Sequence, residues 1–202
     1  MKFLKLAIFF VIFLHISNTK ANEVETWLKK EIDKIIFAYH SEDLPNENRF
    51  LMIEQTINNN FAGAGIAKFV AGKQSWGAAS KDTKIEYIKL FKRHLALNIA
   101  SMMQGYSNQQ YNLINSRYDE NNKVTLIDMD VITETGNIQV TWRVKKSKER
   151  FFIIDLLVAD ISLVVTKRSE FNSMLKGLDY SLAELNNKLI EKNNSSYKKI
   201  IN

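Results

Sequence analysis

The sequence predicts an α+β fold, in which a twisted antiparallel sheet of about four strands is covered on one face by several helices. Two observations predict this class. Apolar residues recur at helical spacing on both sides of the segment 111–158, and within that segment they recur at every second position. Short polar turns separate the predicted strands, so we expect consecutive strands to pair as antiparallel neighbours.

Helical periodicity is clearest over residues 82–104, which follow a predicted N-cap at Ser80. The apolar stripe of this helix contains Ile88, Phe91, Leu95, Ile99 and Met102, and it is widened by Met103. The other predicted helices span 23–40, 46–60, a short stretch near 66–71, 167–176 and 180–193. The polar residues 193–202 are expected to be loose.

Four strands are predicted, over 111–118, 123–133, 137–146 and 151–158. In the third strand, Val140 and Trp142 share an apolar face while Arg143 points to the other, solvated face. The fourth strand is apolar on both faces, which favours burial on both sides. Its uninterrupted apolar face contains Phe152, Ile154, Leu156 and Val158.

Residues 1–21 are predicted to be a secretory signal peptide. Lys2 and Lys5 form a charged start, nine consecutive apolar residues follow at Leu6–Leu14, and Ala21 ends a small-x-Ala pattern. The remaining residues, 22–202, suit one domain with a sizeable core. Without the leader there are 25 basic and 22 acidic residues, a net charge of +3. So mild an excess, with no basic stripe interleaved with aromatics, argues against nucleic acid as a partner.

Motifs for catalysis or metal binding are weak. The absence of cysteine excludes disulfides and thiolate sites, and no histidine pair has ligand spacing, so we expect neither a metal nor another cofactor. His94 is expected at the surface or its boundary. Asp128 and Asp130 share one strand face, which is expected to be solvated, although such a pair can bind a cation or exchange protons. Asp155 lies within an apolar strand and must be hydrogen-bonded or paired with an arginine.

Three segments together resemble the MlaC family, also called the toluene-tolerance (Ttg2) family. Residues 69–95, FVAGKQSWGAASKDTKIEYIKLFKRHL, are similar to its Leu-Gly-x-x-Trp/Tyr and Phe-x-x-x-Phe-x-x-x-Leu segment. Residues 131–144 resemble its paired strands around a Gly turn. Residues 153–171 resemble its aromatic-x-x-Asp-x-x-x-Glu-Gly-x-Ser signature, matched by Asp155 and Ser162.

The chain departs from that signature at Ala159 and Asp160, which stand where Glu-Gly is usual. A glycine there would allow positive φ at no steric cost, so the turn can differ in this chain. No role of the missing glutamate is carried over.

The resemblance implies a monomeric, soluble periplasmic carrier with no catalytic residues. It implies phospholipid as the ligand, and as partners an inner-membrane lipid ABC transporter complex and an outer-membrane lipoprotein complex, so that outer-membrane lipid asymmetry is maintained. We expect an apolar cavity between the sheet and the helices. Its expected lining is Phe91, Leu95, Ile99, Met102, Met103, Val140, Trp142, Phe152, Ile154, Leu156 and Val158. Arg143, Lys167 and Arg168 are candidates for the headgroup phosphate.

Three alternatives remain at this point. The first is a carrier of hopanoids or another apolar molecule. The second is a hydrolase or isomerase that uses Asp155, or the pair Asp128 and Asp130, as a base in an apolar pocket. The third is a partner-binding module whose core is solid and holds no lipid.

Overall fold

The computed structural model describes residues 22–39, 41, 43–104 and 110–202; the predicted signal peptide lies outside them. The helices are an N-terminal helix over 22–39, α2 (Asn46–Asn60), α3 (Gly63–Ala78), α4 (Lys81–Met103), α5 (Leu163–Lys176) and α6 (Leu182–Ile201). The strands are β1 (Tyr111–Asp119), β2 (Val124–Thr133), β3 (Gly136–Ser147), β4 (Arg150–Val158) and β5 (Ile161–Ser162). None of the helices in these ranges is both long enough and apolar enough to cross a bilayer.

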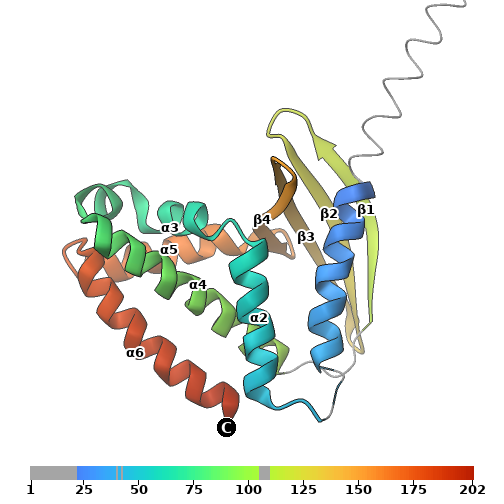
Figure 1. Ribbon diagram of the computed structural model, residues 1–202. Coiled ribbons are helices and arrows are strands. Elements are labelled where there is room, and N and C mark those ends of the chain that lie inside the picture. Colours follow the sequence, from blue (N-terminus) through green and yellow to red (C-terminus); the bar gives the residue numbers. More distant parts are fainter. Residues whose placement is uncertain (1–21, 40, 42, 105–109) are drawn as a thin grey trace, which may run out of the picture.

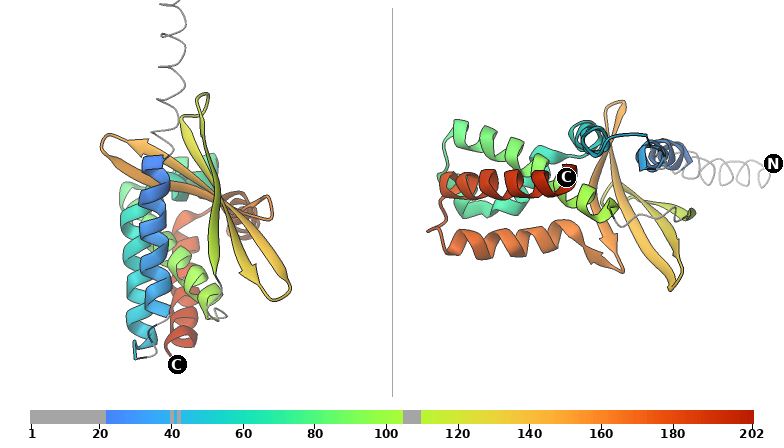
Figure 2. Two further views of the ribbon diagram at one scale, coloured as in Figure 1. Left: turned by 90° about the vertical axis from the view of Figure 1, so that its right-hand side faces the viewer. Right: turned by 90° about the horizontal axis from the view of Figure 1, so that it is seen from below.

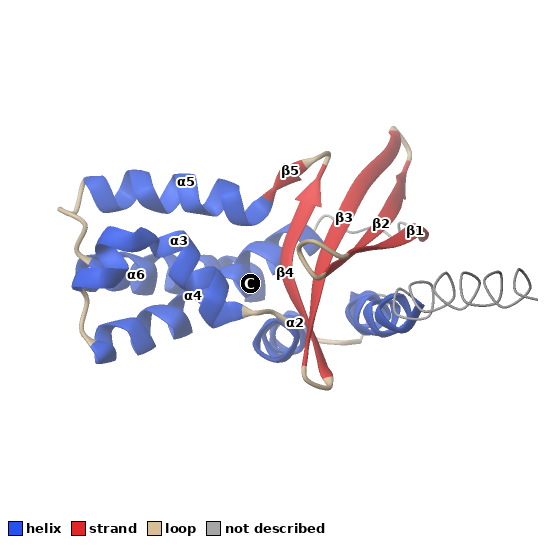
Figure 3. Cartoon of the chain, turned by 90° about the horizontal axis from the view of Figure 1, so that it is seen from above, coloured by secondary structure: helices blue, strands red, loops and turns tan. Residues whose placement is uncertain are grey.

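The strands form one antiparallel sheet in the order β1-β2-β3-β4-β5, as the sequence predicts for the first four (Figures 1 and 3). The fifth strand is an addition to the prediction. It follows a two-residue turn in which Ala159 and Asp160 have φ of 47° and 63°. Two consecutive positive φ values give a turn whose twist suits a tight hairpin. Ala159 and Asp160, the two residues that depart from the family signature, therefore both adopt a left-handed backbone conformation.

The helices divide into two groups. The N-terminal helix and α2 lie side by side over one face of the sheet, and both are seen nearly end-on in Figure 2 from below. The helices α3, α4, α5 and α6 form a bundle beyond the β4 edge of the sheet (Figures 1 and 3). Helix α2 contacts α4, α6 and β4, so it joins the sheet to the bundle.

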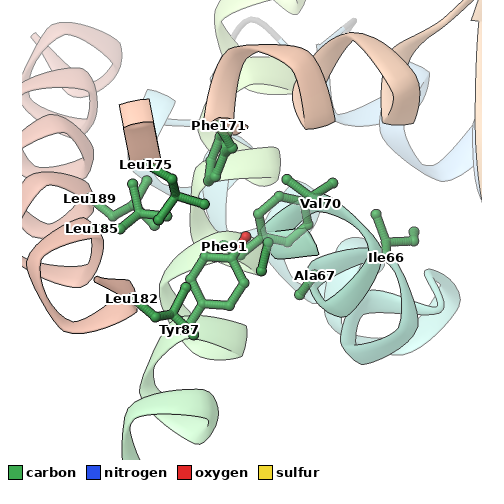
Figure 4. Close-up of a cluster of buried hydrophobic side chains, with 11 residues drawn as sticks. Ile66, Ala67, Val70, Tyr87, Phe91, Phe171, Leu175, Leu182, Leu185 and Leu189 are labelled. Carbon is green, nitrogen blue, oxygen red and sulfur yellow. The ribbon is translucent and has the colours of Figure 1, made fainter. Parts of the chain in front are cut away.

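The bundle core is built around three aromatic rings of α4 and α5 (Figure 4). Tyr87, Phe91 and Phe171 are almost fully buried, and their ring centroids lie 5.6–6.4 Å apart at tilted or edge-on angles. Such geometry is the preferred arrangement of aromatic pairs. Leucines from α6, including Leu185 and Leu189, close this core from the other side.

Two helices are longer than the sequence predicts at their glycine-rich or polar ends. Helix α3 spans Gly63–Ala78 rather than 66–71, with a kink at Gly72, whose φ of 76° suits glycine. Helix α6 continues to Ile201, so the expectation of a loose tail is wrong. Ile200 is buried against α2 and α4, and this packing overrides the low helix propensity of the Asn and Ser residues before it.

Serine caps fix where three of the helices begin. Ser80 accepts from the Thr83 backbone N–H at 3.1 Å, as the sequence predicts. Ser162 accepts from Val165 N–H at 3.0 Å, so α5 begins at Leu163 instead of residue 167. Ser181 caps α6 in the same way through Glu184 N–H. Each cap satisfies a backbone donor that the first helical turn leaves without an intrahelical partner.

Candidate functional site

An apolar cavity of about 210 Å³ lies between the N-terminal helix, α2, the end of α4 and the sheet face that these helices cover. We call this face, which carries Trp142, the inner face. The cavity is lined by Leu28, Glu31, Ile32, Ile35, Ile36, Ile53, Thr56, Ile57, Phe61, Ile99, Met103, Tyr111, Met129, Val131, Trp142 and Ile153. The volume exceeds the roughly 150 Å³ of an apolar cavity known to stay dry and bind benzene.

The polar side chains of the lining direct their polar atoms to other partners. The Glu31 carboxylate accepts from Lys34 Nζ and from Asn60 Nδ2, each at 2.7 Å. Thr56 Oγ1 donates to the Met52 carbonyl at 2.9 Å, and the Tyr111 hydroxyl donates to Asp33. The Trp142 indole N–H is buried with no hydrogen-bond partner in the described part of the chain. The remaining wall is hydrocarbon or thioether, which suits an alkyl chain.

Three of the eleven predicted lining residues contribute to this cavity: Ile99 and Met103 at the end of α4, and Trp142 on β3. Phe91 is instead fully buried in the bundle core. Leu95 packs between the bundle core and the cluster that holds α2 against α4. Met102 is 57% exposed to solvent. Helix α4 therefore reaches the cavity only with its last turns.

A β-bulge changes which β4 residues face the cavity. The register pairs Val144 with Ile153 but Arg143 with Asp155, so Ile154 is the extra residue. The prediction that Phe152, Ile154, Leu156 and Val158 share one face is therefore wrong. Before the bulge, Ile153 faces the cavity and Phe152 lies opposite Lys145 on the outer face. After it, Leu156 and Val158 lie opposite Trp142 and Val140 on the inner face, but outside the cavity lining.

The three cations predicted for a headgroup lie away from the cavity. Lys167 on α5 pairs with Glu170 at 2.8 Å and donates to Asn98 at 3.2 Å. Arg168 stacks over the Phe69 ring at 4.4 Å and donates to the Phe69 carbonyl. Arg143 lies on the outer face of β3. None of the three belongs to the cavity lining.

Most of the cavity wall was not predicted as such. The missed positions are mainly on the N-terminal helix, on α2 and on β2, including Ile32, Ile57 and Met129. Their helical or alternating spacing marked them as buried, but core residues and cavity residues have the same periodicity. A sequence signal for the difference is absent, because it depends on how far apart the elements stand.

A second hollow, which we call the outer groove, lies on the opposite side of β4. Its volume is about 290 Å³, and it is lined by Ala62, Gly65, Ile66, Phe69, Arg143, Ile154, Asp155, Val164 and Val165. A single layer of backbone separates it from the cavity. Phe61 and Ile153 line the cavity while their chain neighbours Ala62 and Ile154 line the outer groove. The Ala62 N–H donates to the Ile153 carbonyl at 2.9 Å across this layer.

Asp155 has the structural role that the sequence predicts. Oδ1 accepts from the Leu156 and Val164 backbone N–H groups at 2.9 and 3.2 Å. Oδ2 accepts from the Ser162 hydroxyl at 2.7 Å and lies 3.5 Å from an Arg143 guanidinium nitrogen. This buried carboxylate thus joins β4 to the first turn of α5, and both its oxygens are engaged.

The other candidate acids and bases also have structural partners. Asp128 pairs with Arg117 and accepts from Thr141 Oγ1 at 2.8 Å, and Asp130 accepts from Asn137 at 3.3 Å. The described residues contain no group of three or more His, Cys, Asp or Glu side chains placed to hold a metal.

His94 is buried between α4 and α6, so the expected position at the surface or its boundary is wrong. Its Nδ1 lies 3.2 Å from Asn193 Oδ1, and its ring packs against Phe171. Burial, reinforced by Lys167 and Lys192, lowers the pKa of His94 to about 4. The imidazole is therefore neutral at neutral pH, in a site that the cavity does not share.

A family model described as MlaC protein matches residues 29–191. The chain belongs to the MlaC family. The match runs through every element that lines the cavity, and it confirms the family predicted from the sequence. A search of curated proteins returned no match.

Among solved structures, the MlaC chain is similar to the phospholipid-binding protein from Ralstonia solanacearum, whose structure contains a phospholipid. The TM-score is 0.72 at 17% sequence identity, and the alignment covers 84% of this chain and 96% of that chain. This similarity confirms the predicted α+β fold, with five strands instead of about four.

Proposed function

We propose that this protein is a carrier that binds phospholipid by enclosing acyl-chain hydrocarbon in the cavity. The supporting observation is an apolar cavity of about 210 Å³ left unfilled by side chains. At about 24 cal/mol per Å³, a fully enclosed empty cavity of this size would cost roughly 5 kcal/mol of folding stability, which is an upper bound for this partly open cavity. That cost is large beside the 5–15 kcal/mol that typically separates folded from unfolded domains. A ligand that fills the cavity removes it.

The chemistry of the wall selects for hydrocarbon. The polar side chains that reach it are hydrogen-bonded elsewhere, apart from the Trp142 indole N–H. A bound polar group would lose its hydrogen bonds to water without replacement. A methylene moved from water into the cavity gains about 0.8 kcal/mol, whereas one moved from a bilayer gains little. The cavity therefore suits exchange of lipid with membranes, because the free energy of an acyl chain changes little when it enters the cavity from a bilayer or returns to one.

The cavity accommodates part of a phospholipid. An apolar cavity of roughly 150 Å³ takes benzene, which has six carbon atoms, so 210 Å³ corresponds to about seven to eight methylene-sized groups. A longer chain requires the N-terminal helix and α2 to move apart from the sheet. The headgroup then remains outside, which fits a lining whose charged side chain among the described residues, Glu31, is already paired with Lys34 and Asn60.

The proposal extends to transport across the periplasm. MlaC family membership and the phospholipid in the Ralstonia structure support a carrier instead of an enzyme. We propose that this carrier is exported by the signal peptide over 1–21, acts as a monomer, and exchanges lipid between an outer-membrane lipoprotein complex and an inner-membrane lipid ABC transporter complex. Such transfer would serve the lipid asymmetry of the outer membrane.

The test is native mass spectrometry of protein expressed with residues 1–21, followed by lipid extraction. We expect a mass increment equal to a phospholipid and phospholipid in the extract. An extract with hopanoid or another apolar molecule would support the alternative cargo. Ligand-free protein that also takes up no lipid from vesicles would exclude the carrier function.

A further inference from the structure

The outer groove combines partly exposed positive charge with apolar walls. Arg143 has 38% of its side chain exposed, its guanidinium lies 3.5 Å from Asp155 Oδ2, and it interacts electrostatically with the Asp119 carboxylate. Most of its five guanidinium donors therefore remain available. Arg168 adds a second guanidinium at the Phe69 end.

The single carboxylate of the outer groove does not offset this charge for a ligand. Asp155 is 6% exposed and both of its oxygens accept hydrogen bonds from Leu156, Ser162 or Val164. Its carboxylate oxygens are thus occupied by hydrogen-bond donors around the start of α5. An incoming group meets Arg143 first, so the outer groove favours an anion.

The walls beside these cations are apolar and incompletely covered. Phe69 is 44% exposed and Val165 is 57% exposed, while Ile66 forms the buried floor. An alkyl chain placed over them would remove apolar surface from water, which favours binding. A small hydrophilic anion would leave this surface exposed.

We propose that the outer groove is a second binding site, which takes a single-chain amphiphile with an anionic carboxylate or phosphate group. Arg143 binds the anion, and the alkyl part lies over Phe69 and Val165. The site is separate from the cavity, because the backbone of Phe61, Ala62 and Ile153 stands between them. The proposal therefore does not rest on the proposed carrier function.

The experiment is a two-dimensional ¹H–¹⁵N NMR titration of delipidated protein with three probes: octyl phosphate, octanol and inorganic phosphate. We expect octyl phosphate to shift the amide signals of Gly65 and Val165 saturably and to bind more tightly than either other probe. Equal affinity for inorganic phosphate would show that the walls contribute nothing. Equal affinity for octanol would show that Arg143 contributes nothing. Either result overturns the proposal, as do shifts confined to cavity residues such as Met129.

Variants separate the groove from the rest of the molecule. Arg143→Gln should weaken octyl phosphate binding at least tenfold, because a hydrogen bond to a charged group contributes about 1.5–3 kcal/mol. Arg150→Gln is the matched control: Arg150 lies on the same hairpin, outside the groove, and its loss should change the affinity less than twofold. Should Arg143→Gln fail to fold, Val165→Glu places a negative charge at an exposed groove position and should abolish binding. Unchanged affinity in both groove variants would refute the site.

A cavity variant distinguishes this proposal from the carrier function. Ile99→Trp occupies the cavity and leaves the outer groove intact. It should lose copurified phospholipid while its affinity for octyl phosphate stays within twofold of the unchanged protein. A parallel loss of both activities would show one shared site and would refute a separate groove site.

Discussion

Ile99→Trp provides a test of the cavity in which lipid binding and stability change in opposite directions. Ile99 lines the cavity from the end of α4. Tryptophan adds about six heavy atoms to the side chain, against a cavity that holds about seven to eight methylene-sized groups. The substitution should therefore occupy most of the space that a lipid tail would use.

The magnitudes follow from the volume. The variant loses room for about six methylenes, each of which contributes about 0.8 kcal/mol when it leaves water. The binding free energy of a lipid tail therefore weakens by roughly 5 kcal/mol, which raises its Kd more than a thousandfold. Filling the space also removes much of the cavity's cost, which is at most roughly 5 kcal/mol. Allowing for strain in the new side chain and for its indole N–H, which finds no partner in the apolar wall, we expect lipid-free Ile99→Trp to gain about 1 kcal/mol. This corresponds to a melting temperature about 2–4 °C above that of delipidated unchanged protein.

The assays are lipid extraction with native mass spectrometry, and thermal unfolding of delipidated protein followed by circular dichroism. Ile85→Trp is the matched control, because Ile85 lies on the same helix and is 56% exposed. It should change neither the bound lipid nor the melting temperature appreciably. If Ile99→Trp instead melts lower, as overpacking of a filled core would cause, or retains normal lipid, the cavity is not the binding site.

Three further predictions concern stability. Because the pKa of His94 is lowered to about 4, protonation favours the unfolded chain, so the free energy of unfolding should fall by about 2 kcal/mol from pH 7.5 to pH 5. Urea unfolding of His94→Gln should lack most of this decrease, and an equal decrease in the variant would reject His94 as its source. Asp155→Asn should lower the melting temperature by roughly 5–12 °C, since a buried carboxylate loses charge-assisted hydrogen bonds; an unchanged melting temperature would contradict its structural role. Ala159→Gly should raise the free energy of unfolding by about 0.5–1 kcal/mol in urea, because residue 159 has a φ of 47°. The control Ala183→Gly, within α6, should lower the free energy of unfolding. A lower free energy of unfolding for Ala159→Gly would show that the backbone at residue 159 is not strained.

The sequence was sufficient to predict the class, the strand order and most of the helices, because each rests on local periodicity. It also placed Val140 and Trp142 on the inner face of the sheet, since β3 runs without a bulge against β2. The same reasoning failed on β4, where Leu156 and Val158 lie on the inner face but Phe152 and Ile154 lie on the outer face. The bulge at Ile154 carries no glycine or proline that could mark it, and one extra residue moves all later side chains to the other face.

The cavity itself could not be predicted. Phe91 and Ile99 belong to one apolar stripe of α4, two turns apart, and the pattern treats them alike. Phe91 meets α5 in the bundle core, whereas Ile99 meets empty space beside the sheet. Periodicity shows which side of a helix avoids water. What stands opposite that side, and at what distance, is decided by the packing of elements distant in the chain.

The last two turns of α6 have a consequence for cargo capacity. The Tyr197 hydroxyl donates to Glu47 at 2.7 Å, its ring meets Phe50 edge-on at 5.2 Å, and Ile200 packs into the same cluster. These contacts pack α6 against α2 through Phe50, which lies on the same helix face as the cavity residues Ile53 and Ile57. Trimming α6 before Tyr197 would remove packing that holds this wall of the cavity in place. Proteins that differ only in this stretch of α6 would then be expected to accept acyl tails of different cross-section.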